Sequence, residues 1–253
     1  MLRGLYLADS GLLAAQHLND VVANNLANVS TPGFKSDVAT DKTFDQVLME
    51  RLQQEPSPQG NGASAAPIGY EASGVVVDSI VPNLTAGAIV PTGNVTDLAI
   101  DGTGLFQVST PSGIRYTRSG NFLTDKNGDL VTTQGYNVMG TKGPIQGLAG
   151  QKFTVSADGT VTANGQVIDK LAVQSFAPGS LRKDGDNLFL AQGQSVNSVN
   201  VIKQGYLEQS NVSMATEMTN MINAMRTYEA NQKVVQTLDG TLEKAANEIA
   251  KIS

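Results

Sequence analysis

The sequence contains no cysteine and no tryptophan, and its only histidine is His17. The lack of cysteine excludes disulfides, thiolate nucleophiles and cysteine-ligated metals, and a single histidine excludes a metal site built from several imidazoles. Aromatic residues make up only 5% of the chain, which argues against a platform for stacked bases. The residues that remain favour a structural or binding protein over an enzyme.

Positive charge and long apolar runs are also scarce. The chain has 17 Lys and Arg against 23 Asp and Glu, so bulk attraction to nucleic acid or anionic lipid is not expected. No apolar stretch approaches the roughly 18 residues that a membrane span needs, which predicts no membrane insertion. Asp9 interrupts the apolar N-terminus too early for a secretory signal, so we expect no cleaved signal peptide.

The first thirty residues carry apolar side chains at alternating spacings of three and four, broken only at Asn19. This period predicts a helix over residues 1–30 with a narrow apolar seam. Pro32 and Gly33 should end it, because proline disfavours a helical residue before it and glycine suits a left-handed turn position. The seam consists of Leu5, Ala8, Leu12, Ala15, Val22, Leu26 and Val29.

A second helix is predicted from Ser213, a suitable N-cap, to Ile252. Its expected seam breaks strict alternation between Val235 and Leu238, which resembles a stutter. A narrow seam has little to bury alone, so each end helix should pack against the other and against further copies. The expected seam consists of Met218, Met221, Met225, Tyr228, Val235, Leu238, Leu242, Ala245, Ile249 and Ile252.

Between the two ends the apolar period changes to two, which is typical of strands. Dipeptides that tolerate positive φ separate the runs and favour hairpin turns. Residues 122–131 and 153–161 share a strand-turn-strand rhythm and predict two related hairpins. The expected strands are 98–100, 105–108, 114–117, 129–132, 153–155 and 161–163, with turns at 112–113, 127–128, 158–159 and 164–165.

The predicted fold is therefore α+β. Long N- and C-terminal helices pair as a coiled-coil-like domain, and an all-β domain of short antiparallel strands is inserted between them. We expect the helical domain at 1–30 and 205–253, a turn and flexible linker at 31–69, and the β-rich core at 70–204. Proline, glycine and serine are concentrated in residues 53–67, which predicts a mobile loop there.

Several motifs have a functional and an ordinary interpretation, and the ordinary one is favoured in each case. His17 lies mid-helix with no partner in sequence to make it a base, so a surface or interface role is expected. Residues 102–104 begin like a dinucleotide fingerprint, but a strand follows instead of a helix, so a tight turn is expected. Residues 125–129 and 183–187 carry oxygen ligands without completing a calcium loop, so polar turns are expected.

A methionine-rich face is formed by Met214, Met218, Met221 and Met225. Core packing is the default interpretation. Methionine also suits surfaces that pack against slightly different neighbours, and this second interpretation gains weight if the protein polymerises.

Three segments, in the right order, resemble the bacterial flagellar rod and hook proteins. The first is Asn24-Asn25-Leu26-Ala27-Asn28 followed by Thr31-Pro32-Gly33-Phe34. The second comprises residues 97–106 and 116–122, and the third is the run at 204–212, continued at 217–218 and 226–231. The length is closest to the proximal or distal rod type. The resemblance covers nearly the whole chain except roughly residues 45 to 70.

The resemblance implies a structural subunit that is exported unfolded through the flagellar type III apparatus and assembles outside the cytoplasmic membrane. Copies would form a helical homopolymer that contacts other rod and hook proteins and transmits torque from motor to hook. The terminal helices would line its inner wall and the β domain its outer layer. No catalysis, cofactor or metal is implied.

The residues that would form the assembly interface combine the family signature with the two seams. For the amides of the signature two roles stay open, helix-end capping and hydrogen bonding across neighbouring subunits. The expected interface consists of Leu5, Leu12, Val22, Asn24, Asn25, Leu26, Asn28, Val29, Pro32, Gly33, Gln209, Ser210, Asn211, Val212, Met218, Ile222, Met225 and Tyr228.

Two alternatives come from other classes of protein. One is a β-domain carbohydrate-binding module or enzyme with helical oligomerisation arms, for which Asp158, Asp184 and Asp186 would be the acidic candidates. The other is a soluble coiled-coil adaptor, which would be poor in strands.

Overall fold

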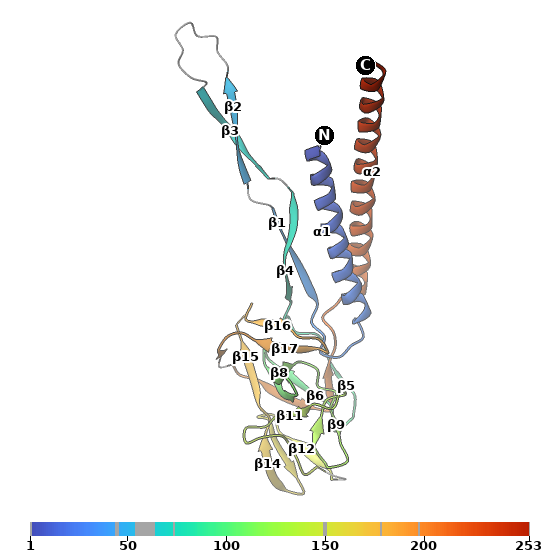
Figure 1. Cartoon of the computed structure of the whole chain (residues 1–253). Coiled ribbons are helices and arrows are strands. Elements are labelled where there is room, and N and C mark those ends of the chain that lie inside the picture. The colour runs from blue at the N-terminus through green and yellow to red at the C-terminus, as the bar shows by residue number, and fades with distance from the viewer. Residues whose placement is uncertain are drawn as a thin grey trace. The chain divides into compact units, whose positions relative to one another are not determined.

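The computed structural model describes residues 2–43, 46–53, 64–72, 74–148, 151–177, 179–196 and 198–252. In these residues the chain begins with helix α1 (Leu2–Ala27), continues through short strands, and ends with helix α2 (Met214–Ile252) (Figure 1). The predicted α+β class is confirmed. None of the described helices combines the length and apolarity needed to cross a bilayer.

The strands before the largest sheet are β1 (Asp37–Thr43), β2 (Gln46–Gln53), β3 (Ser64–Ala72), β4 (Val75–Pro82), β5 (Ile89–Pro91) and β6 (Leu98–Asp101). Those that follow are β7 (Leu105–Thr110), β8 (Gly113–Thr117), β9 (Leu123–Thr124), β10 (Leu130–Val131), β11 (Asn137–Val138), β12 (Phe153–Val155) and β13 (Thr160–Ala163). The last are β14 (Gln166–Lys170), β15 (Val173–Phe176), β16 (Leu181–Lys183), β17 (Leu188–Ala191), β18 (Ser195–Val196), β19 (Val201–Gln204) and β20 (Tyr206–Glu208).

The chain forms two compact units, each made of separate stretches of sequence. The helical unit contains residues 1–23, 39–80 and 218–253, and the β unit contains residues 24–38 and 81–217. The division into 1–30 with 205–253, 31–69 and 70–204 stays a prediction.

The helical unit is built on an antiparallel pair of helices, α1 and α2 (Figure 1). Small side chains on α1 face α2, with Gly4 against Leu238 and Gly11 against Asn231. A Cβ atom added at Gly11 would lie only 2.6 Å from the Asn231 Nδ2 atom. The absence of side-chain bulk at this position therefore lets the two backbones approach closely.

The register of the seam on α2 differs from the prediction. Ala224 is buried, whereas Met218, Ile222 and Met225 are 48%, 52% and 49% exposed. Asn231 and Leu238 face Gly11 and Gly4 of α1, and the less exposed positions of α2 include Met221, Ala224 and Val235. Met218 and Met225 of the predicted seam are therefore not covered by α1, and their contact with further copies stays a prediction, whereas Asn231 faces Gly11.

Helix α1 ends at Ala27, three residues earlier than predicted. The Asn28 side-chain amide donates to the Asn24 carbonyl oxygen at 2.9 Å, and the Thr31 hydroxyl donates to Asn28 Oδ1 at 3.1 Å. These local bonds replace the next helical turn. The start of α2 is as predicted, because Ser213 precedes Met214 and its carbonyl accepts the first helical bond from the Glu217 amide at 2.9 Å.

Strands occupy parts of the stretch for which a flexible linker was predicted, and the prediction needs correction there. Strand β1 pairs with β4, and β2 pairs with β3. Pro67 faces Glu50, and the register shifts between Met49 and Glu50. A proline, which lacks an N–H, is tolerated at such an irregularity, so the prolines of this stretch did not exclude pairing. The centre of the predicted mobile loop, 54–63, lies outside the described residues.

The β unit holds the apolar core. Its largest sheet among the described residues runs β16-β17-β8-β7-β11-β10-β9, and β15 joins it at β7. Leu98, Phe106, Leu130 and Val138 are fully buried, and the Phe106 ring meets the Phe122 ring edge to face at 5.1 Å.

The two predicted hairpins are confirmed. Strand β9 pairs antiparallel with β10, and β12 pairs antiparallel with β13. Their turns place Gly128 at φ +87° and Gly159 at φ +89°, where glycine avoids the Cβ clash that other residues incur.

Candidate functional site

Two of the family-like segments meet in the β unit, although one lies near each end of the chain. The Gly33 amide donates to the Glu208 carbonyl oxygen at 2.7 Å, and the Ser36 amide donates to Asn211 Oδ1 at 2.7 Å. We call the meeting of residues 24–38 with 204–212 the signature junction. It brings together predicted interface residues from both termini, including Gly33 and Asn211.

A buried ion cluster lies at the centre of the signature junction. The Lys35 ammonium donates to Glu208 Oε1 at 2.6 Å, and the side chains of these residues are only 2% and 1% exposed. The Arg118 guanidinium donates through Nε to the other carboxylate oxygen, Glu208 Oε2. One carboxylate thus joins the N-terminal segment, the end of β8 and the C-terminal strand β20.

The cluster carries one more positive than negative charge, and main-chain oxygens compensate for it. Arg118 Nη2 donates to the Ile100 and Gly102 carbonyl oxygens at 2.8 and 2.7 Å, and Nη1 donates to that of Gly104. Lys35 also donates to the Thr85 carbonyl oxygen at 2.7 Å. The Gly102–Gly104 turn, considered above for phosphate binding, therefore presents its carbonyls to an arginine.

Burial and charge act on the pKa values of this cluster in opposite directions. Burial alone would raise the pKa of Glu208, but the charge of Arg118 and the hydrogen bond from Lys35 outweigh it and hold the pKa below its ordinary value. For Lys35 burial dominates and lowers the pKa, against the hydrogen bond and charge of Glu208 and aided by the like charge of Arg118. The carboxylate is therefore ionised at neutral pH, and the cluster depends on it.

Asn25 is used within the chain. Its side chain is buried, with Nδ2 donating to the Asp37 carbonyl oxygen at 2.9 Å and Oδ1 accepting from the Asp37 amide at 2.8 Å. The pair of bonds fastens the end of α1 to the first residue of β1. The Asn28 amide serves the helix end described above, where Asn24 contributes its main-chain carbonyl oxygen, so the contacts seen for the Asn25 and Asn28 amides favour the local role.

Asn211 fastens the C-terminal segment in the same way. Besides accepting from the Ser36 amide, it donates through Nδ2 to the Asn83 carbonyl oxygen at 2.9 Å. Its neighbours in the predicted set are also held, because the Gln209 amide donates to the Ala88 carbonyl oxygen at 2.8 Å and Val212 is buried.

Lys183 completes the junction from strand β16. Its ammonium donates to the Lys35 carbonyl oxygen at 2.6 Å and to Asp37 Oδ2 at 2.8 Å, and it lies 4.0 Å from the centre of the Phe34 ring. Burial lowers the pKa of Lys183, and the hydrogen bond to Asp37 opposes this effect. Sequence reasoning missed Lys35, Arg118, Lys183 and Glu208 as partners, because nothing in their spacing relates residues so far apart.

Gly33 occupies a position that no other residue fits. Its φ is +68°, as the predicted turn required, and an added Cβ would lie 2.5 Å from the carbonyl carbon of Arg118. The backbone of the N-terminal segment therefore lies directly against the backbone that carries the arginine.

A hollow of about 310 Å³ opens on the signature junction. Four of its lining residues, Val29, Pro32, Gln209 and Ser210, belong to the predicted interface, and Val90 and Leu207 add apolar surface. The structure thus groups these predicted residues around one concave surface.

The remaining predicted residues lie on the helices. In the helical unit Leu5 and Leu12 are half-buried, and Val22 is buried. In the β unit Leu26 is half-buried. Met218, Ile222 and Met225 form an exposed row along one side of α2, which we call the methionine row, and Tyr228 at its edge is 41% exposed.

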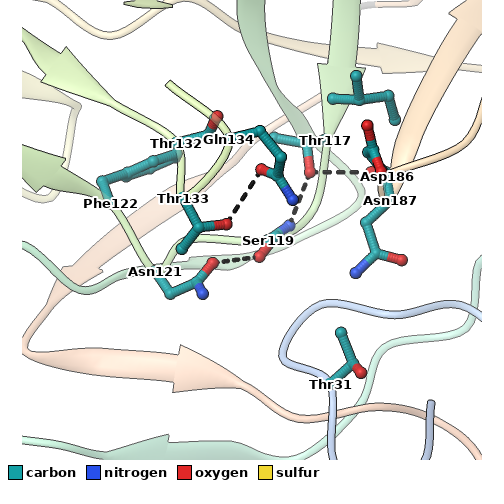
Figure 2. Close-up of a pocket in the computed structure, with 11 residues that line it drawn as sticks. Thr31, Thr117, Ser119, Asn121, Phe122, Thr132, Thr133, Gln134, Asp186 and Asn187 are labelled. Carbon is teal, nitrogen blue, oxygen red and sulfur yellow. Dashed lines mark hydrogen bonds between the residues drawn. The ribbon is translucent and has the colours of Figure 1, made fainter. Parts of the chain in front are cut away.

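A small polar pocket lies in the β unit beside Thr31 of the signature junction (Figure 2). Thr31, Thr117, Ser119 and Asn121 line it together with Asp186 and its neighbours. Its volume is about 60 Å³. One water needs about 10–15 Å³ of such cavity space, so the pocket has room for a few water molecules.

The other polar motifs form turns, as the ordinary interpretation predicted. Asp125 Oδ1 accepts from the amides of Asn127 and Asp129, each at 2.8 Å. Asp158 accepts from the Thr160 hydroxyl at 2.7 Å, and Asp184 pairs with Arg115 at 2.5 Å. Among the described residues no cluster of three or more histidine or acidic side chains could hold a metal ion.

Comparison with known proteins extends over both termini and the core. Residues 5–35 match the family model described as flagella basal body rod protein. Residues 99–163 match the flagellar hook protein FlgE/F/G D1 domain. Residues 203–248 match the flagellar basal body rod FlgEFG protein C-terminal model.

Similar proteins match along their whole length. The chain is 35% identical over 274 residues to the flagellar hook-basal body complex protein FlhO of Bacillus subtilis (strain 168), covering 100% of both chains. It is 35% identical to the flagellar basal-body rod protein FlgG of the same organism, with 98% of this chain and 99% of that protein covered. FlgG of Agrobacterium fabrum is 36% identical, with 94% and 96% covered. The chain belongs to the flagellar basal-body rod and hook protein family, in the group of the FlgF and FlgG type.

Proposed function

We propose that the chain is a structural subunit of the bacterial flagellar basal-body rod. The observation that carries the proposal is the similarity to proteins named basal-body rod protein over essentially the full length of both chains. Copies polymerise into a helical tube that also contacts other rod and hook proteins, and the tube transmits torque from motor to hook. The role is mechanical, and no catalytic step belongs to it.

The exposed methionine row supports the polymer. Met218, Ile222 and Met225 follow one another at spacings of four and three, so they form one stripe on α2, and each is about half exposed. Such a stripe suits the face of another helix. Methionine side chains adapt to different neighbours, which a subunit with several contacts in a tube requires. In this arrangement the terminal helices line the inner wall and the β unit forms the outer layer.

Export and location follow from the same proposal. The subunit passes the cytoplasmic membrane unfolded through the flagellar type III apparatus and resides in the basal body. The signature junction then forms after export, because it needs segments from both ends of the chain.

The methionine row offers a test that separates assembly from folding. Ile222→Asp adds a charge on the row, where it should block helix contacts, whereas the isolated chain leaves this position open to solvent. We expect thermal unfolding within about 0.5 kcal/mol of the parent and no rod. Asn223→Asp is the matched control, because it adds the same charge one residue further on at an exposed position off the row.

The readouts are thermal unfolding of the purified chain, electron microscopy at high concentration, and motility of cells that lack their own copy. Full motility with Ile222→Asp would contradict the role of α2 in assembly. Leu26→Asp extends the test to the end of α1: the chain should stay soluble and β-folded and should fail to build a rod. If the parent chain neither forms tubes nor restores motility, the proposed function itself is wrong.

A further inference from the structure

The two methionines of the methionine row lie open to solvent in the single chain. Met218 is 48% exposed and Met225 is 49% exposed. The main chain of a helix is enclosed by its side chains, so this exposure falls mainly on the thioether ends. Elsewhere on α2, Met214 is also 49% exposed, whereas Met221 is half-buried.

Thioethers are the side chains of this protein that an oxidant attacks most readily. The sequence has no cysteine thiol and no tryptophan indole that could react first. Oxidation of sulfur follows its exposure, so Met218 and Met225 should react sooner than the half-buried Met221 and Met139. An oxidant that reaches the free chain therefore modifies the row itself.

Hydrogen peroxide is an oxidant that can supply the oxygen atom. A lone pair of the methionine sulfur attacks one peroxide oxygen, an S–O bond forms, and the O–O bond breaks. The other oxygen takes up the protons and leaves as water, so the sulfur loses two electrons and the peroxide gains two. The product, methionine sulfoxide, is polar, and methionine sulfoxide reductases convert it back to the thioether.

We propose that Met218 and Met225 form a reversible oxidation site that decides whether the free chain can assemble, an inference that rests on the proposed polymer. Oxidation of both replaces two of the three apolar side chains of the row with sulfoxides. A sulfoxide oxygen accepts hydrogen bonds from water on the free chain, but an apolar contact with another helix offers it no donor. Oxidised chains therefore stay folded and unassembled, and reduction makes them competent again.

The same exposure separates this effect from an effect on folding. In the free chain the two side chains already lie half in water, so an added oxygen takes no packed contact from the β unit or from α1. In the proposed polymer the row is covered by other copies, which should shield its sulfur atoms from the oxidant. The modification thus acts on the subunit before it assembles.

Peroxide treatment of paired variants tests the site. Met218→Leu with Met225→Leu keeps both positions apolar and removes their sulfur. Met214→Leu with Met221→Leu is the matched control, because it removes two sulfur atoms from α2 outside the row. Each full-length chain is treated with hydrogen peroxide, freed of it and concentrated, and peptide mass analysis locates the added oxygen.

We expect treatment to raise the concentration that the parent and the control need for assembly at least about tenfold. The chain with leucine at positions 218 and 225 should assemble as before treatment. Methionine sulfoxide reductases for both sulfoxide epimers should restore assembly of the parent. Thermal unfolding of the treated parent should match that of the untreated chain.

Three results would overturn the oxidation site and leave the proposed function standing. The first is an equal loss of assembly with and without sulfur at positions 218 and 225. The second is full assembly of a parent that carries oxygen at both positions, and the third is loss of cooperative unfolding on treatment. Failure of the untreated parent to assemble would instead overturn the proposed function, and the control of assembly with it.

Discussion

The helical unit and the β unit hide their apolar residues to very different extents. In the β unit one cluster of large apolar side chains is covered, and Leu98, Phe106 and Leu130 are fully buried. In the helical unit the buried apolar side chains are few and no larger than valine, and Met218, Ile222 and Met225 are about half exposed. The β unit has a core of its own, whereas the helix pair keeps apolar surface that one chain does not cover.

The difference shows that a periodic apolar residue can have one of two roles. It can fill the core of its own chain, or it can remain exposed on the surface of that chain. In the β unit, period-two positions fill the core of one molecule. On α2 the apolar residues at spacings of three and four include the buried Ala224 and also positions that remain exposed. Variants that act on one unit and spare the other can therefore test the comparison.

The largest effect is expected from Glu208→Gln in the β unit. It leaves Lys35 and Arg118 buried without their counter-charge, which should lower the free energy of unfolding by about 3–5 kcal/mol. The measurement is urea unfolding followed by tyrosine fluorescence, to which Tyr116, Tyr136 and Tyr206 of the β unit contribute. Asp101→Asn removes an exposed pair with Lys203 and should change stability little, because water screens the two charges. Similar losses of unfolding free energy for both variants would mean that the buried cluster contributes no more to stability than the exposed ion pair.

Gly33→Ala should have the next largest effect. The new Cβ meets the backbone at Arg118, and the residue must keep a positive φ, so we expect a loss of about 2–3 kcal/mol. Gly135→Ala shares the positive φ but has open space around the added atom, and it should cost about 1 kcal/mol. Equal losses would show that backbone strain alone matters at position 33.

Gly11→Leu probes the helical unit. A leucine side chain cannot fit where even a Cβ lies 2.6 Å from Asn231 Nδ2, so the helices must separate, at a cost of about 1–2 kcal/mol. Hydrogen exchange should rise in α1 and in α2 beyond Met218 and stay unchanged in β6–β8. Faster exchange in those strands would mean that the two units do not behave separately.

The smallest effect is a gain. Gly240 lies inside α2, and an added Cβ would have nothing within 4 Å. Gly240→Ala should therefore raise helix stability by about 1 kcal/mol through propensity alone. Helical content on heating is the measurement, and a decrease would mean that an unseen contact needs the glycine.

Local patterns predicted the fold class and several details correctly. The glycines at 33, 128 and 159 adopt the positive φ that their turns required, and α2 begins directly after Ser213. These features depend on neighbouring residues. The strands at 46–53 and 64–72 were missed because proline and glycine nearby suggested a linker, while their stability depends on pairing with each other.

The site was only partly predictable for the same physical reason. The signature amides and Gly33 stood out as a motif, but the ion cluster depends on tertiary contacts. Nothing in the spacing of Lys35, Arg118 and Glu208 indicates that they meet. The predicted seam of α2 did not include the buried Ala224, because hydrophobicity alone does not indicate how closely two helices approach.

The bond between Lys35 and Glu208 joins positions 173 residues apart. Closing so long a loop costs entropy before any contact is gained, so this bond belongs to the late steps of folding. A chain that emerges from a narrow passage beginning with either end cannot form it until the other end has followed. We expect residues 24–38 to exchange amide hydrogens freely in a chain cut after residue 204, and slowly once the full chain is present. The ion cluster therefore forms only when the segments from both ends of the polypeptide are present together.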